Sequence, residues 1–428
     1  MLIVAIAFAV LVLLGMPVAF AIGISGMLFF LQNPFLPLTM PIQLTVTQTQ
    51  NFALLAVPLF IIAGNLLNHS GITERLLRLA TVITGRLRGG LAQVTIALSA
   101  LMGGVSGSSI ADAAMQSRML GGEIMRRGFP RGFTAAIISW SSLLTPIIPP
   151  GIGFILYGSI GQVSIGRLFA AGLLPALLLW LVLAVTVSLI ARRRGWAPEL
   201  PQRPRPREVA GAVWASGFAI LFPIILLVGL RFGVFTPSEI GAFAVVYAVL
   251  VGVLAHRQLN ARNAGEALQS SMADIGAVMF LIAMSAILGY GIVFERVPDA
   301  ASSAILGLTT DPIVIMLLVI ALLVVAGMMV DGSILIIMLT PILLPLARQA
   351  GIDPVHFGVV FVIGATLSNY TPPVGAAMYA VCSILRCTVA EYTRASLPLI
   401  AAVLVALGLL IMVPEISLWL PNLMFGAD

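Results

Sequence analysis

The sequence predicts an all-α, polytopic membrane protein made of two inverted repeats, each with five spanning helices, one re-entrant hairpin and discontinuous helices. Of its 428 residues, 60% are hydrophobic and only 9% are charged, whereas soluble domains carry about 25% charged residues. No Asp, Glu, Lys or Arg occurs before Glu74. Apolar segments recur along the chain. In lipid the backbone must pair its own polar groups, which favours helices.

The net charge of +6 does not indicate a nucleic-acid partner. The basic residues are all Arg and lie between the apolar segments. This is the distribution that the positive-inside rule predicts for the cytoplasmic loops of a membrane protein. The two cysteines, Cys382 and Cys387, are five residues apart. This spacing puts them on different faces of a helix, so we expect neither a disulfide nor a metal pair.

The first repeat covers residues 1–194. Residues 2–31 are too long for one span, and Gly15-Met16-Pro17 divides them into two. Residues 72–88 form an amphipathic arm that lies on the membrane surface. Residues 91–125 are interrupted by Gly and Ser at 103–109, which is typical of a re-entrant hairpin. The other segments are a span at 52–67, a helix at 133–160 that is broken at 145–150, and a span at 168–190.

A cytoplasmic linker rich in Pro and Arg occupies residues 195–209 and separates the halves. The second repeat, residues 210–428, follows the same plan. Its segments are spans at 212–230, 240–254 and 275–293, an amphipathic arm at 295–311, a hairpin at 312–346, a broken helix at 359–385 and a span at 397–413.

Matching motifs recur in the same order at a nearly constant offset. Pro17 and Pro237 are 220 residues apart, and Pro149 and Pro372 are 223 apart. Ser-Gly-Ser at 106–108 matches Asp-Gly-Ser at 331–333. Five crossings and one hairpin make an odd repeat, so its copy inserts upside down. The charges agree: with both termini outside, the Arg-rich arm at 72–88 and the linker fall inside, while the acidic arm at 295–311 falls outside.

The helix breaks are the places where a transporter could bind its cargo. Each break exposes carbonyl groups, which suit a cation, and N–H groups, which suit an anion. Asp112 and Asp331 lie beside the two hairpin breaks. Each could ligate a cation or cap a helix, and the same choice applies to Ser368, Asn369 and Thr371. Ser108 lies one helical turn before Asp112, so both could face one ion. Hard oxygen ligands favour an alkali ion.

Three other functions are less consistent with the sequence. Gly104-Val105-Ser106-Gly107 resembles the motif of rhomboid serine proteases, but His69, His256 and His356 lie at segment edges or in connectors. An aspartyl pair of Asp112 and Asp331 lacks the GxGD motif of intramembrane aspartyl proteases. A passive channel remains an alternative, although duplicated broken helices favour alternating access. We therefore expect a transporter and no enzyme.

Taken together, the motifs resemble those of the DctM-type large membrane subunit of TRAP transporters. The motifs are Gly-Met-Pro-Val-Ala-Phe-Ala at 15–21, Gly-Gly-Val-Ser-Gly-Ser-Ser-Ile-Ala-Asp at 103–112, Thr-Pro-Ile-Ile-Pro-Pro-Gly at 145–151, Gly-Met-Met-Val-Asp-Gly-Ser at 327–333 and Asn-Tyr-Thr-Pro-Pro-Val-Gly at 369–375. The resemblance implies an elevator mechanism, sodium-coupled import of an organic acid and a bacterial inner-membrane location. It also implies two partners: a separate, small four-helix membrane subunit and a periplasmic substrate-binding protein.

The resemblance further implies where the ligands bind. One sodium site would use Ser108, Asp112 and carbonyl groups near Ile147 and Pro150. Members of the family often carry an amide where Asp112 stands. The second sodium site would use Asp331, with Ser333 beside it, and the break formed by Ser368, Asn369, Thr371 and Pro372. The substrate is expected at Ser106, Gly107, Ser109, Pro149 and Pro373. Sodium is the only metal implied, with no organic cofactor. A self-sufficient ion-coupled carboxylate transporter remains the alternative.

Overall fold

The computed structural model describes residues 1–200, 202–328, 330–372 and 375–426, and within them every regular element is a helix. Five of these helices are long and apolar enough to cross a membrane, or up to seven if each of two bent pairs counts as one span. The all-helical, multi-pass architecture predicted from the sequence is therefore confirmed. Leu177, Leu181, Val185 and Leu189 of one long helix are all exposed at four-residue intervals, as a lipid-facing stripe requires.

The first half contains eleven α-helices and two short 3₁₀ turns. They are α1 (Leu2–Leu13), α2 (Val18–Gln32), α3 (Met40–Thr49), η1 (Phe52–Leu55), α4 (Ala56–Asn68), α5 (Ile72–Thr84), α6 (Leu91–Ser106), α7 (Ser109–Met119), α8 (Gly121–Arg126), α9 (Arg131–Ser141), η2 (Ser142–Leu144), α10 (Ile152–Gly161) and α11 (Ile165–Arg194). The expected arm at 72–88 thus contains α5, and the expected hairpin at 91–125 contains α6, α7 and most of α8.

After the linker, the second half contains eleven more helices and one π-helical turn. They are α12 (Pro206–Ala215), α13 (Gly217–Arg231), α14 (Pro237–Leu250), η3 (Val251–Ala255), α15 (Ala261–Phe294), α16 (Val297–Leu306), α17 (Pro312–Gly327), α18 (Gly332–Gln349), α19 (Pro354–Leu367), α20 (Ala376–Leu385), α21 (Val389–Met412) and α22 (Glu415–Phe425). Here α16 lies in the expected arm, and α17 and α18 lie in the expected hairpin.

Helix length alone does not reproduce the ten spans, two of them broken, that the sequence predicts. Residues 2–31 divide into α1 and α2 at Gly15, which has φ +81°, and at Pro17. Residues 212–230, expected to be one span, belong to α12 and α13, which are bent by 58°. The reason is local: Gly and Pro interrupt segments whose composition is apolar enough to cross.

The expectation for the two cysteines was wrong in one respect. They are free, but their sulfur atoms lie 3.3 Å apart. The helix that carries Cys382 ends at Leu385, and Arg386 adopts a left-handed conformation with φ +52°. The chain therefore turns back, and Cys387 does not continue the helical spacing.

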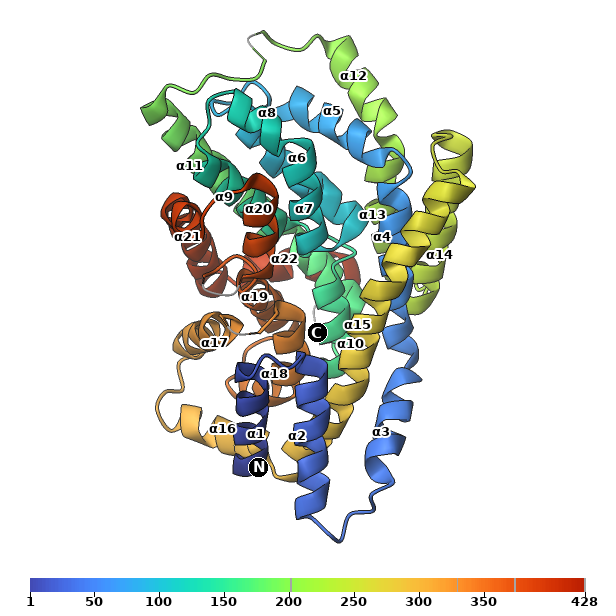
Figure 1. Ribbon diagram of the computed structural model, residues 1–428, viewed down its shortest axis with the longest axis vertical. Helices are drawn as coiled ribbons and strands as arrows, with labels where there is room; N and C mark the ends of the chain where they lie inside the picture. The colour runs from blue at the N-terminus through green and yellow to red at the C-terminus, as the bar shows by residue number, and fades with distance from the viewer. Residues whose placement is uncertain (201, 329, 373–374, 427–428) are drawn as a thin grey trace.

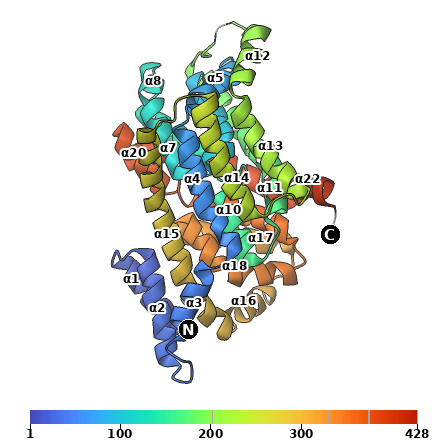
Figure 2. The same cartoon turned by 90° about the vertical axis from the view of Figure 1, so that its right-hand side faces the viewer.

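The elements separate toward the two ends of the long axis (Figures 1 and 2). Helices α5, α8 and α12 lie near one end, and α1, α2, α3 and α16 lie near the other. The linker before α12 runs along the first end. The Arg-rich parts of the chain therefore gather at the end opposite to α16, which carries Asp299.

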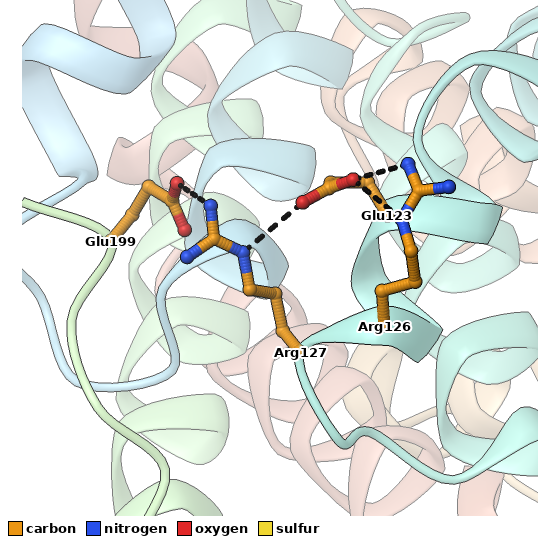
Figure 3. A network of polar contacts seen from close by, with 4 residues as sticks. All are labelled: Glu123, Arg126, Arg127 and Glu199. Carbon is orange, nitrogen blue, oxygen red and sulfur yellow. Dashed lines mark hydrogen bonds and ion pairs between the residues drawn. The ribbon is translucent and has the colours of Figure 1, made fainter.

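A polar network fastens the linker to the end of the first hairpin (Figure 3). Glu123 of α8 forms ion pairs with Arg126 and Arg127, and Arg127 also contacts Glu199 of the linker at 2.8 Å. The next linker residue, Leu200, donates its backbone N–H to the carbonyl of Gly85 after α5, at 2.9 Å. The linker thus contacts both the arm and the first hairpin.

Helices of one half pack against helices of the other half in reciprocal pairs. Helix α4 packs against α14, and α2 packs against α15. In the same reciprocal manner, α10 packs against α18, and α20 packs against α7. Buried tyrosines add polar links: the Tyr157 hydroxyl donates to the carbonyl of Pro354 at 2.8 Å, and the Tyr392 hydroxyl donates to Ser139 Oγ at 3.1 Å. Neither half is a separate body.

Glycine follows both Pro-Pro breaks because the chain folds back on itself there. A Cβ at Gly151 would collide with the carbonyl oxygen of Pro146, and one at Gly375 would lie 2.8 Å from the carbonyl oxygen of Asn369. These breaks can form only if no side chain intrudes.

We expect Gly151→Ala to destabilise the protein by about 1–3 kcal/mol, because the added methyl group overpacks a rigid backbone turn. The midpoint of thermal unfolding of the purified protein measures this effect. Gly408→Ala is the matched control, because Gly408 lies inside α21 with no atom within 4 Å of its would-be Cβ. Equal midpoints for the two variants would contradict the tight turn.

Candidate functional site

Both hairpin tips meet the long helices α4 and α15 at a cavity of about 290 Å³, called the central cavity below. Seven of the residues singled out from the sequence line it: Ser106, Gly107, Ser108, Ser109, Asp331, Ser333 and Asn369. They come from both hairpins and from the second Pro-Pro break. The outermost two, Ser106 and Asn369, are more than 220 residues apart in the sequence. The fold thus brings together polar groups that the sequence could only predict separately.

The first tip owes its shape to a glycine and a serine. Helix α6 ends where Gly107 adopts a left-handed conformation with φ +61°, which glycine tolerates best. Ser108 then caps α7, accepting a hydrogen bond at Oγ from the N–H of Ala111 at 3.5 Å. A Cβ at Gly107 would lie only 2.6 Å from the carbonyl oxygen of Pro150. The first Pro-Pro break therefore packs directly under this tip.

At the second tip, Asp331 caps α18. Its Oδ1 accepts a hydrogen bond from the N–H of Ser333 at 2.8 Å. Capping was one of the two roles open to this residue. Its other oxygen, Oδ2, makes no hydrogen bond within the described part of the chain, so capping leaves one oxygen of Asp331 available at the cavity.

Asp112 lies away from the central cavity, in a buried polar cluster. Its Oδ2 accepts hydrogen bonds from Ser99 Oγ at 2.8 Å and Thr145 Oγ1 at 3.0 Å, and Gln116 Nε2 lies 2.9 Å from both carboxylate oxygens. The sequence pairs Asp112 with Ser108, but Ser108 lines the cavity and Asp112 does not. Asp112 instead joins the first hairpin to the first broken helix.

The remaining residues predicted as ligands lie in the two breaks. Pro149 and Pro150 are buried, and a Cβ at Gly172 of α11 would collide with the carbonyl oxygen of Ile147. The carbonyl of Thr145 lies nearer that hairpin, 3.1 Å from the position of a Cβ at Gly103. This carbonyl was not among the predicted ligands.

In the second break, two hydroxyl groups are engaged within their own helix end. Ser368 Oγ donates to the carbonyl of Ala365 at 2.7 Å, and Thr371 Oγ1 approaches the carbonyl of Leu367 at 3.3 Å. Pro372 follows them without lining the cavity, and Pro373 lies outside the described residues. Asn369 differs: its Nδ2 donates to Ser109 Oγ at 3.4 Å and so joins this break to the first hairpin tip.

Sequence reasoning missed the contribution of α4 and α15. Asn65, Asn68 and Asp274 line the central cavity from these two helices, and Asn65 Nδ2 donates to Ser271 Oγ at 2.9 Å. An acid directly before a long apolar segment was the available signal for Asp274. Along the same face of α15 lies a second cavity of about 430 Å³, lined by Ser285 and by Gln48 of α3.

The site lacks the parts that a protease would need. No histidine is among the described residues that line the central cavity, and the buried Oγ of Ser106 has no hydrogen-bond partner there. Within the described part of the chain, no group of three or more His, Cys, Asp or Glu residues could hold a metal ion.

Comparison with known proteins shows the family of the chain. Residues 5–416 match the family described as the DctM component of the tripartite ATP-independent periplasmic transporter. The chain belongs to this DctM family. It is a transporter permease, and not an enzyme. The family that the motifs predict is thereby confirmed.

The relatives of this DctM-family chain carry different substrate names. The sialic acid TRAP transporter large permease SiaM of Vibrio cholerae is 31% identical, with 96% of each chain covered. The C4-dicarboxylate large permease DctM of Pseudomonas aeruginosa is 31% identical, with 94% of each covered. The isethionate permease DctMQ of Oleidesulfovibrio alaskensis is 33% identical over 96% of this chain but only 65% of that longer protein.

Two solved transporters share the fold at low sequence identity. The YdaH transporter of Alcanivorax borkumensis superposes with a TM-score of 0.65 at 16% identity, covering 88% of each chain. MtrF of Neisseria gonorrhoeae gives a TM-score of 0.59 at 15% identity, covering 87% of this chain and 83% of that one. This likeness concerns the fold alone.

We expect Asp112→Ala to destabilise the DctM-family chain by about 1–3 kcal/mol, because Ser99, Gln116 and Thr145 would lose a shared acceptor in a buried site. Asp112→Asn keeps the size and one acceptor oxygen, so it should cost less. The midpoint of thermal unfolding distinguishes them. An alanine variant as stable as the unmodified protein would show that the cluster contributes nothing to stability.

Proposed function

We propose that this chain is the translocating subunit of a sodium-coupled importer of an organic acid in a bacterial inner membrane. It would receive its substrate from a periplasmic binding protein and work with a small four-helix membrane subunit. The observation that carries the proposal is the central cavity, where both hairpin tips face α4 and α15. Membership of a tripartite periplasmic transporter family supports the two partners.

Reciprocal packing supports two inverted repeats, covering residues 1–194 and 210–428 and joined by the linker at 195–209. The pairs α4–α14 and α2–α15 exchange the roles of the two halves, as do the pairs α10–α18 and α20–α7. The arms α5 and α16 lie toward opposite ends of the molecule (Figure 1), as inverted copies would. Their charges favour the end with α5 as cytoplasmic.

An elevator movement fits the contacts between the hairpins and the outer helices. A Cβ at Gly64 of α4 would lie 3.2 Å from backbone atoms of Ser106, and one at Gly104 would lie 3.1 Å from Pro223 of α13. Small residues at these contacts leave a smooth surface along which the hairpins and broken helices could slide. The polar network of Glu123, Arg127 and Glu199 would have to break or move with them.

Sodium coupling is proposed from the oxygen atoms at the breaks. At the second tip, Asp331 offers a carboxylate oxygen beside Ser333 and Asn369, a set of hard ligands that suits an alkali ion. At the first tip, the candidate ligands are the Ser108 hydroxyl and the carbonyl of Thr145, which lies close to Gly103 of the same hairpin. Asp112 Oδ1 accepts a hydrogen bond only from Gln116 among the described residues. Bound sodium would place positive charge near the anion.

We expect Asp331→Asn to raise the sodium concentration needed for half-maximal uptake at least tenfold, since one charged ligand worth about 1.4 kcal/mol or more is lost. The amide keeps an acceptor oxygen for the cap. Asp311→Asn is the matched control, because Asp311 caps α17 with the same 2.8 Å hydrogen bond at an exposed position. A sodium dependence unchanged in Asp331→Asn would leave this residue as a helix cap only.

We expect proteoliposomes that contain this chain and its small subunit to take up substrate only when binding protein is added outside. Labelled isethionate, sialic acid and succinate are suitable probes. Uptake should require an inward sodium gradient. Each net positive charge carried inward gains about 2.3 kcal/mol per 100 mV, so an inside-negative potential should stimulate import with two sodium ions per monoanion.

Three control arms omit the binding protein, the sodium gradient or the small subunit. Comparable uptake of free substrate by this chain alone would contradict dependence on a binding protein. It would favour the alternative of a self-sufficient ion-coupled carboxylate transporter.

A further inference from the structure

The central cavity has one charged side chain on the wall opposite the hairpins, Asp274 of α15. The 34-residue helix carries Arg262 and Glu266 near its start, and after Asp274 no charged residue follows up to Phe294. Asp274 lies 13 residues along this helix, about 20 Å from its first residue. Ala277 and Val278 line the cavity beside it. The position is therefore at the start of the apolar part of the helix, directly before the predicted span at 275–293.

Nothing in the described part of the chain compensates this carboxylate. Asp274 makes no hydrogen bond or ion pair among the described residues, and its side chain is exposed to the cavity. No Arg or His is among the described residues that line the cavity, and the sequence contains no Lys. A carboxylate at membrane depth is costly unless a cavity or a partner stabilises it. Asp274 faces the cavity, so a ligand that enters the cavity could become its partner.

The opposite wall has the complementary polarity. Helices α7 and α18 begin at the two tips, so their positive dipole ends face the same cavity, and the sodium ion proposed at Asp331 would offset the charge of that carboxylate. The positive dipole ends favour the acidic end of a substrate. Ser106 Oγ and Asn68 Oδ1 are buried atoms of cavity-lining residues that have no hydrogen-bond partner within the described chain.

We propose that Asp274 is a specificity-determining residue that selects organic monoanions carrying a hydrogen-bond donor or a cationic group remote from the acid, and rejects dianions. This inference rests on the proposed transport function and names its substrate class. The acid group would face the hairpin tips, and a hydroxyl or ammonium group would donate to Asp274. A second carboxylate at that place would meet a like charge, which at the effective dielectric of such a site disfavours binding about 100-fold.

The test compares hydroxy acids with diacids of the same carbon number. The pairs are 3-hydroxypropionate and malonate, 4-hydroxybutyrate and succinate, and gluconate and glucarate. Each compound is titrated at saturating sodium against the purified complex of this chain and the small subunit, with the thermal-unfolding midpoint as the readout. In every pair that binds, the hydroxy acid should bind about 100-fold more tightly than the diacid.

In Asp274→Asn the preference should fall below tenfold, because the amide no longer repels the second carboxylate. Asp274→Glu keeps the charge and should retain the preference. Glu266→Gln removes one negative charge from the same helix outside the cavity, where Glu266 pairs with Arg262 at 3.1 Å. It should leave the preference unchanged. Equal midpoints without ligand show that the variants are folded.

Several outcomes would overturn the proposal. One is tighter binding of any diacid than of its hydroxy acid by the unmodified complex. Another is an unchanged preference in Asp274→Asn. A third is a raised sodium requirement without a changed preference, which would make Asp274 a cation ligand. If no compound stabilises the complex, the cavity is not selective as proposed. Sodium-driven uptake through the binding protein would survive that result, so the two proposals fail separately.

Discussion

The need to pair every backbone polar group at membrane depth governs this structure. Four helix breaks interrupt the helical hydrogen bonding inside the protein, where the exposed N–H and carbonyl groups need other partners. Each hairpin tip packs against a helix break. The first tip lies against the carbonyl of Pro150. At the second tip, a Cβ at Gly332 would lie 2.6 Å from the carbonyl oxygen of Ala365. The polar backbone that could bind a ligand is also the backbone that must be packed.

The sequence predicts the breaks well because Gly and Pro act locally. Gly107 ends a helix by its own conformation, and Pro149 and Pro150 lack donors wherever they stand. Helix ends at these positions could therefore be predicted from the chain, and seven of the residues singled out beside them line the central cavity. Partners across the fold could not be predicted. Nothing near Asp112 in the sequence distinguishes a cation ligand from an acceptor for Ser99 and Thr145.

The two acids singled out from the sequence differ for a physical reason. Asp331 precedes its helix, so its carboxylate binds the first turn and stays at the cavity. Asp112 is the fourth residue of α7, a turn further from the tip, and there it meets α6 and the first broken helix. A shift of one turn therefore moves a carboxylate from the cavity into the packed interior. Asp274 was missed because no motif surrounds it in the sequence. Only the position of α15 in the fold shows that Asp274 lines the cavity.

Reciprocal packing also constrains how the site can move. Helix α20 of the second half packs against α7 of the first hairpin, and α10 of the first half packs against α18 of the second. The Asn369–Ser109 hydrogen bond joins the same two parts at the cavity. Neither hairpin can shift far without separating from a broken helix of the other half. Such an interlock favours displacement of both hairpins and both broken helices as one unit, past α4 and α15. A ligand held at the tips would then leave Asp274 behind, so the carboxylate would act on binding at one end of the movement and not throughout it.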